Sequence, residues 1–164
     1  MTCWKDPSKV LVGVDKDYNG VNYLSLFNPF ANEHINTKNL LGRLESTNKG
    51  VKGIGRKFFY HQILSGDSSD NYFANSASDV KWGEKSSYNI LKDLNTDKEC
   101  WQAIIDCYKK LYPESKIITG WRGNEFEIDW LYVLNENAIM AHMLRFDGDW
   151  FDIISLFDRL GVEY

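Results

Sequence analysis

Residues 9–14, Lys-Val-Leu-Val-Gly-Val, form a short apolar run, and this run constrains the fold more than any other feature. β-Branched side chains favour extended backbone, and a continuous apolar run indicates a strand buried on both faces. Such a strand needs neighbours on both sides. The chain offers one further good strand, over residues 21–27, where apolar and polar residues alternate. We therefore expect a sheet whose other strands are absent on the N-terminal side.

The rest of the chain is predicted to be mainly helical. Residues 30–53 are polar, contain several glycines and show little periodicity, so a loop or short irregular pieces are expected there. The clearest helix covers 95–112, where Asn95 or Thr96 can cap an apolar stripe that includes Trp101. Gly161 is expected to end the last helix. The other predicted helices cover 56–64, 84–94, 127–146 (with a break at 135–137) and 152–160.

These elements predict an α/β fold that is mostly α. Short strands near the N-terminus, the remnant of a parallel sheet, precede an α-helical body. The 164 residues are expected to form a single domain, 1–164, with a strand-containing segment over 1–53 and the helical body over 54–164. A hydrophobic fraction of 43% and an aromatic fraction of 15% suffice for a packed core.

Composition also bounds the location and the class of partner. No apolar run reaches the roughly 18 residues of a membrane span, and the N-terminus lacks the apolar segment of a signal peptide. The three cysteines form no CxxC pair, and Cys100 and Cys107 are expected to be buried free thiols. These features predict a cytoplasmic protein. The net charge of −4 argues against coating nucleic acid by bulk charge, although carboxylate-rich metal sites also make a nuclease acidic.

Asp15 and Asp17 follow the predicted strand directly, in the segment Asp-Lys-Asp-Tyr-Asn-Gly. This segment matches the opening of a calcium loop, but the twelfth position is Leu26 instead of the required Glu, and a strand precedes it instead of a helix. Carboxylates at the end of a strand can reach one pocket and suit Mg²⁺ or Mn²⁺. Taken alone, the pair is explained slightly better as a polar exit from the strand.

Asp67 and Asp70 lie in a second acidic segment, Gly-Asp-Ser-Ser-Asp-Asn. Their spacing places both on one side of a helical turn, where they could hold a metal ion. As an isolated motif, this segment is explained better as a turn followed by a helix cap. Four carboxylates in one place would repel one another unless divalent cations compensate.

A helix start after this loop is a candidate phosphate clamp. Gly83 permits a tight turn, Ser86 and Ser87 lie in the first helical turn, and Lys81 and Lys85 flank them. The exposed N–H groups of a helix start favour anions. An ordinary helix start with solvated lysines explains the segment equally well. A second basic run could follow a nucleic-acid strand or form a solvated face: Lys49, Lys52, Arg56 and Lys57.

The order of these segments resembles the C-terminal half of the 5′-nuclease superfamily. This superfamily includes flap endonucleases, the 5′-nuclease domain of bacterial DNA polymerases and phage 5′–3′ exonucleases. Its pattern is a DxD after a strand, a GDxxDN loop, and a helix–hairpin–helix-type element that binds duplex DNA. Here the matching segments are 15–17, 66–71 and 82–87. The segments 100–115 and 137–149 also resemble the tail of exonucleases from short-tailed phages.

The resemblance implies metal-dependent hydrolysis of phosphodiester bonds at or near DNA 5′ ends, as in DNA replication. Two Mg²⁺ or Mn²⁺ ions, about 4 Å apart, would activate the attacking water and stabilise the leaving oxygen. The implied catalytic and metal-binding residues are Asp15, Asp17, Asp67 and Asp70. The implied contacts to backbone phosphates are Lys81, Gly83, Lys85, Ser86 and Ser87.

The resemblance also implies partners. The substrate would be duplex DNA with a 5′ end or flap, in the host cytoplasm if a phage encodes the chain. In the superfamily, a longer α/β half supplies further carboxylates and catalytic cations, and no such half precedes Met1. A separate polypeptide is therefore expected to supply it. The alternatives are a non-catalytic remnant that binds DNA or a partner, and an unrelated interaction protein with acidic loops.

Overall fold

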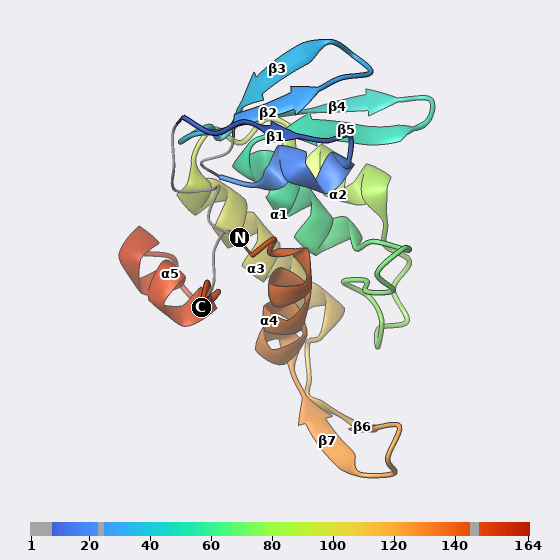
Figure 1. The fold of residues 1–164 in the computed structure, drawn as a ribbon. Helices are drawn as coiled ribbons and strands as arrows, with labels where there is room; N and C mark the ends of the chain where they lie inside the picture. The colour runs from blue at the N-terminus through green and yellow to red at the C-terminus, as the bar shows by residue number, and fades with distance from the viewer. Residues whose placement is uncertain (1–7, 23–24, 145–147) are drawn as a thin grey trace.

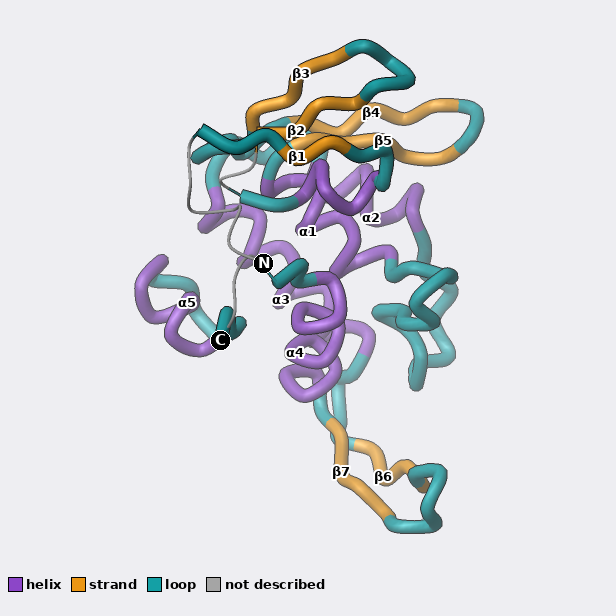
Figure 2. The backbone as a smooth tube through the Cα atoms, in the orientation of Figure 1, coloured by secondary structure: helices purple, strands orange, loops and turns teal. Residues whose placement is uncertain are grey.

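The computed structural model describes residues 8–22, 25–144 and 148–164 (Figure 1). Within these ranges the fold has mixed α/β content, with five α-helices and short strands in small sheets. Most strands gather at one end of the helices, and one hairpin projects from the other end (Figure 2). No helix in the described ranges is long and apolar enough to cross a membrane.

The first sheet has the order β1-β2-β3 and is mixed. β1 pairs with β2 in parallel, and β2 pairs with β3 in antiparallel orientation. The prediction of a strand buried on both faces is wrong for this run: Val10, Val12 and Val14 are 44%, 63% and 54% exposed. The reason is that β1 lies at the sheet edge. The strands cover Leu11–Val12 (β1), Ser25–Asn28 (β2) and Glu33–Asn36 (β3).

The second sheet is a hairpin of β4 (Arg43–Thr47) and β5 (Gly50–Ile54), in a segment where we expected an irregular loop. That prediction is wrong. The strands lack alternating apolar residues, but contacts with other parts of the fold hold them in place. Leu44 is buried in the core, and the backbone N–H of Val51 donates to Glu84 Oε2 at 3.2 Å. The hairpin thereby rests on α1 and on the start of α2.

The helices follow their sequence signals closely. Thr96, one of the two predicted caps, begins α3 and forms a complete capping box with Glu99. Gly161 ends α5 in the left-handed conformation, as predicted. The helix expected over 127–146 begins later, because Glu125–Ile128 (β7) pairs with Lys116–Thr119 (β6). It also ends earlier, at Ala141, and is continuous through 135–137, where a break was expected. The helices cover Arg56–Ser65 (α1), Glu84–Leu91 (α2), Asp97–Leu111 (α3), Trp130–Ala141 (α4) and Ile153–Leu160 (α5).

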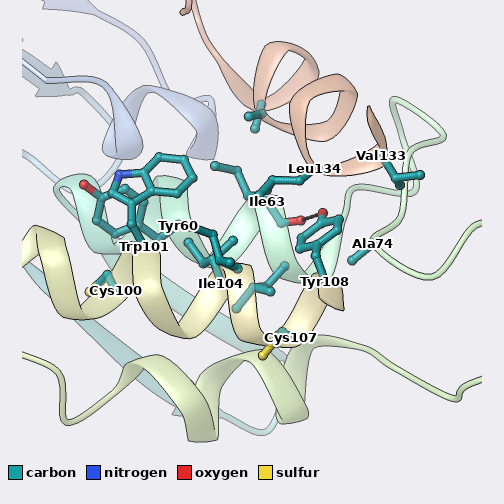
Figure 3. Packing of buried hydrophobic residues seen from close by; sticks show 14 of the residues in the cluster. Tyr60, Ile63, Ala74, Cys100, Trp101, Ile104, Cys107, Tyr108, Val133 and Leu134 are labelled. Carbon is teal, nitrogen blue, oxygen red and sulfur yellow. Dashed lines mark hydrogen bonds between the residues drawn. The ribbon is translucent and has the colours of Figure 1, made fainter. Parts of the chain in front are cut away.

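The main core surrounds α3, whose buried face includes Trp101 and Tyr108 (Figure 3). Tyr108 donates a hydrogen bond to the carbonyl oxygen of Ile63 at 2.7 Å and accepts one from Asn137 Nδ2 at 2.8 Å. Cys100 and Cys107 are buried free thiols, as expected; Cys3 lies outside the described residues. Under the first sheet, Val21 and Leu26 form a second, much smaller apolar cluster.

Gly66 ends α1 in a conformation that a side chain cannot share. Its φ is +76°, and a Cβ there would lie 2.2 Å from the carbonyl oxygen of Tyr72. We expect Gly66→Ala to lower the free energy of unfolding by at least about 2 kcal/mol, since this backbone region, which is essentially restricted to glycine, alone costs another residue about 1–3 kcal/mol. Urea unfolding measures this. Gly123→Ala, with φ +81° and no atom within 4 Å, is the control; equal losses in both variants would contradict the steric argument.

Candidate functional site

The first acidic pair lies on the 3₁₀ helix η2 (Lys16–Gly20), which follows β1. Asp15 caps this helix: its Oδ1 accepts a hydrogen bond from the backbone N–H of Asp17 at 3.0 Å, and the residue is exposed. Asp17 is half-buried against α1, where its Oδ1 accepts from Gln62 Nε2 at 2.6 Å. The two carboxylates therefore have different surroundings, and Asp17 is the one held inside the molecule.

The second acidic pair lies on a tight loop after α1. Asp67 and Tyr72 exchange backbone hydrogen bonds of 2.9 and 3.2 Å, which close the loop at its base. Asp67 is 6% exposed, and its Oδ1 accepts from the N–H of Ser69 at 2.7 Å. Asp70 is exposed further along the loop. The turn interpretation thus describes the backbone, while the side chain of Asp67 points inward.

Lys16 connects the two acidic segments. Its Nζ donates to Asp67 Oδ2 at 2.5 Å, and this hydrogen bond raises the pKa of Lys16. Burial would raise the pKa of Asp67, but the hydrogen bonds from Lys16 and Ser69 outweigh it and lower that pKa. Burial raises the pKa of Asp17, and the charges of Asp15 and Asp67 add to the effect. Asp17 and Asp67 therefore lie close enough to interact electrostatically.

The pKa of Tyr72, which closes the loop, responds to the charges of the same carboxylates. Burial raises the pKa of Tyr72, and the carboxylates of Asp67, Asp17 and Asp70 raise it further. Three of the four predicted carboxylates therefore lie within electrostatic reach of one phenol. Asp15 interacts with Asp17 but does not contribute at Tyr72.

The donor set suits one divalent cation bound in part by other groups. Mg²⁺ usually binds one or two carboxylates and completes its shell with water and substrate phosphates. Asp17 and Asp67 can supply that pair of hard oxygen ligands. Within the described ranges, no group of three or more His, Cys, Asp or Glu side chains is arranged to hold a metal ion.

A cleft of about 410 Å³ opens beside Asp67, between the β4–β5 hairpin, η2 and α1. His61 lines it; burial lowers the pKa of this histidine to about 4, so the ring is neutral. Its Nδ1 lies 3.1 Å from Ser65 Oγ, and its Nε2 has no hydrogen-bond partner among the described residues. The charged side chains around the cleft belong to Lys16, Lys49, Lys52, Asp67 and Glu84.

The start of α2 reaches this cleft through Glu84. The preceding loop is fixed to α1, because Trp82 Nε1 donates to the carbonyl oxygen of Leu64 at 2.8 Å. Gly83 has extended backbone, and a Cβ there would meet open space. Lys81 and Lys85 are exposed and Ser86 is half-buried. Ser87 is fully buried, and its hydroxyl donates to the carbonyl oxygen of Gly83 at 3.1 Å.

The second basic run is divided by the fold. Arg56 makes two hydrogen bonds of 2.8 Å to the carboxylate of Asp97, and buried Lys57 donates to the carbonyl oxygen of Lys92 at 3.2 Å. Neither is free to follow a nucleic-acid strand. Lys49 and Lys52 remain exposed on the hairpin, beside the cleft.

Three residues of the site were not predicted from the sequence: Lys16, Gln62 and His61. Lys16 had a usable signal, because a cation between two acidic residues is placed to neutralise them. Gln62 and His61 had none, since both look like ordinary residues of a helix that packs on the core. Their roles depend on how α1 meets η2 and the hairpin.

Comparisons of the chain with protein-family models, with curated proteins and with solved structures found no match. The resemblance to the 5′-nuclease superfamily therefore stays a prediction that depends on the order of the motifs.

Proposed function

We propose that this chain is the C-terminal portion of a metal-dependent 5′–3′ exonuclease or flap endonuclease that hydrolyses DNA phosphodiester bonds. The observation that supports the proposal is that Asp17 and Asp67 lie within electrostatic reach of each other, with Lys16 hydrogen-bonded to Asp67. These carboxylates come from the two acidic motifs whose order resembles the superfamily. The nuclease would act in the cytoplasm. If a phage encodes the chain, this would be the cytoplasm of the host.

Asp17 and Asp67 would hold one Mg²⁺ or Mn²⁺ ion. Asp15, Asp70 and carboxylates of the partner would complete the site for the second ion as the substrate binds. A bound divalent cation supplies a polarised phosphoryl oxygen and an activated water. Gln62 and the Ser69 N–H keep the two inner carboxylates oriented. A cation at Asp67 would replace the ammonium of Lys16, which could then neutralise a phosphate.

Duplex DNA would contact the start of α2. Lys81 and Lys85 supply charge, and Gly83 and Ser86 let a phosphate approach the exposed backbone N–H groups. Ser87 would act through its position in the first turn, because its hydroxyl already donates to Gly83. We interpret α1, the loop over 66–83 and α2 as the counterpart of the helix–hairpin–helix-like element.

A separately supplied N-terminal half would add to the edge of β1. Among the described residues this strand pairs only with β2, and an unpaired edge accepts a further strand. The exposed side chains of Val10, Val12 and Val14 would be covered in that assembly. In this interpretation β1 and β2 are the remnant of a parallel sheet, and the partner contributes the remaining carboxylates.

The test is a cleavage assay on 5′-labelled duplex and flap DNA with Mg²⁺ or Mn²⁺. The chain is assayed alone and together with polypeptides encoded beside it. We expect short products with 5′-phosphates, and no products when a chelator removes the metal. Absence of metal-dependent cleavage in every combination would overturn the proposal.

The second candidate is a non-catalytic remnant that binds DNA or a partner. The 2.5 Å ion pair of Lys16 with Asp67 favours it, because an ammonium occupies one carboxylate oxygen that a metal would need. Calorimetric titration with Mn²⁺ separates the two functions. A nuclease should bind Mn²⁺, and Asp67→Asn should abolish this binding. A remnant should bind DNA but show no Mn²⁺ binding that depends on Asp67.

A further inference from the structure

We infer that a second cavity, lined by aromatic rings, binds a nucleobase that carries a 5′-phosphate. The ligand could be a free nucleoside monophosphate or the terminal nucleotide of a strand, since both present the same chemistry. The inference goes beyond the proposed cleavage, because such binding needs neither a metal ion nor Asp67.

The cavity measures about 320 Å³ and lies between η2, α1, α3, α5 and residues 141–143 and 150–152. This volume falls within the roughly 300–1,000 Å³ of small-molecule sites. Asp17 lines one part of it, so the cavity adjoins the candidate metal site. The aromatic residues in its wall are Phe59, Tyr60, Trp101, Trp150 and Phe151.

The rings offer faces and edges to a planar ligand. Phe59 and Phe151 have centroids 5.8 Å apart with planes at 69°, and Trp101 lies 6.3 Å from Phe151 with planes at 32°. Trp150 borders the same cavity and is 76% exposed. A tryptophan so exposed beside a cavity can cover a base, and every nucleobase has a face that stacks on such rings.

Trp101 adds an unsatisfied donor. The residue is 1% exposed, and its indole Nε1 is buried without a hydrogen-bond partner among the described residues. Buried donors are nearly always paired, so an unpaired one beside a cavity indicates an acceptor that arrives with a ligand. Ring nitrogens and carbonyl oxygens of nucleobases are acceptors of this kind.

The cavity wall carries two guanidinium groups, of Arg56 and Arg159, and two carboxylates, of Asp17 and Asp152. Asp152 is engaged with Ser155 as the cap of α5. Arg56 is committed to Asp97 through two hydrogen bonds. Arg159, in the last turn of α5, is exposed and has no ion pair with a described carboxylate. A guanidinium binds a phosphate through two parallel hydrogen bonds. We therefore assign the base to the rings and the 5′-phosphate to Arg159.

Calorimetry with 2′-deoxyadenosine 5′-monophosphate tests the inference, with a chelator present. We expect saturable binding that Trp150→Ala weakens about tenfold, the loss of one stacked base. Arg159→Gln should weaken binding of the monophosphate but not of deoxyadenosine. Both residues are exposed, so thermal unfolding should be unchanged in either variant.

The chain contains a matched control. Trp121 and Arg122 are also an exposed Trp and Arg, on the β6–β7 hairpin, with 4.4 Å between the guanidinium carbon and the ring centroid. Trp121→Ala and Arg122→Gln should leave binding unchanged. If the monophosphate does not bind, or if Trp150→Ala and Trp121→Ala weaken it equally, the inference is wrong.

Two further arms identify the source of the ligand and separate the two proposals. A 5′-phosphorylated oligonucleotide that competes with the monophosphate supports a strand end; binding of the monophosphate alone supports a free nucleotide. Asp67→Asn should bind the monophosphate like the wild type. A variant that loses cleavage but still binds the nucleotide is therefore defective in the metal site only. A variant that cleaves DNA but no longer binds the nucleotide is defective in the cavity only.

Discussion

Asp67→Asn is expected to slow metal-dependent cleavage of 5′-labelled duplex DNA at least about a hundredfold, because replacing a mere supporting partner of a metal ligand already costs about 10–100-fold. The change removes the buried negative charge beside Lys16. Asparagine keeps an oxygen that can accept from the Ser69 N–H, so the loop should retain its shape. The assay uses whichever preparation cleaves DNA, the chain alone or with its partner.

Two variants control for the loss of charge. Asp106→Asn changes an exposed residue of α3 that lines neither of the two cavities, and should cleave at the wild-type rate. Asp70→Asn should have a smaller effect than Asp67→Asn, because Asp70 is exposed on the loop. Wild-type cleavage by Asp67→Asn would remove Asp67 from the site.

The free energy of unfolding is expected to fall by about 3 kcal/mol between pH 6.5 and pH 4 because of His61. The slope is about 1.4 kcal/mol for each pH unit between the pKa of the unfolded state and that of the folded state. Burial lowers the pKa of this histidine from 6.5 to about 4. Between these values the unfolded chain binds a proton that the folded protein excludes. Acid therefore favours unfolding through that window, and the contribution stops growing below about pH 4.

Urea unfolding at several pH values measures this dependence. His61→Gln should flatten it, whatever its effect on stability at neutral pH. His34→Gln, on the exposed strand β3, should leave the wild-type slope intact. Equal slopes for the wild type and His61→Gln would show that another group is responsible.

Local signals predicted the helices well. The capping box of Thr96 and Glu99 and the glycine at 161 act within one turn of the chain, so the sequence contains the whole interaction. The β4–β5 hairpin could not be predicted in this way. Its strands contain polar residues and glycine, and they are held by contacts with α1 and with Glu84, which lies far along the chain.

The candidate site was predictable in part. The acidic motifs directed attention to two segments that adjoin in the structure, where the charge of Asp67 acts on Asp17 and Lys16 pairs with Asp67. Which carboxylate of each pair turns inward could not be predicted. Gln62 draws Asp17 against α1, while capping of η2 keeps Asp15 outside. Both choices depend on packing between segments that are distant in the sequence.

Because the apolar cluster of Val21 and Leu26 is small, we expect the part of the site that it anchors to open locally. Asp17 belongs to the segment that this cluster anchors, whereas Asp67 follows α1, which is built into the main core. Hydrogen bonds join the two parts: from Gly55 N–H to the carbonyl oxygen of Asn19, 2.8 Å, from Gln62 to Asp17, 2.6 Å, and from Lys16 to Asp67, 2.5 Å. A sub-global opening that breaks these links would separate the carboxylates without melting the helices. A strand added at β1 would oppose that opening, so a partner could promote metal binding without contributing a ligand.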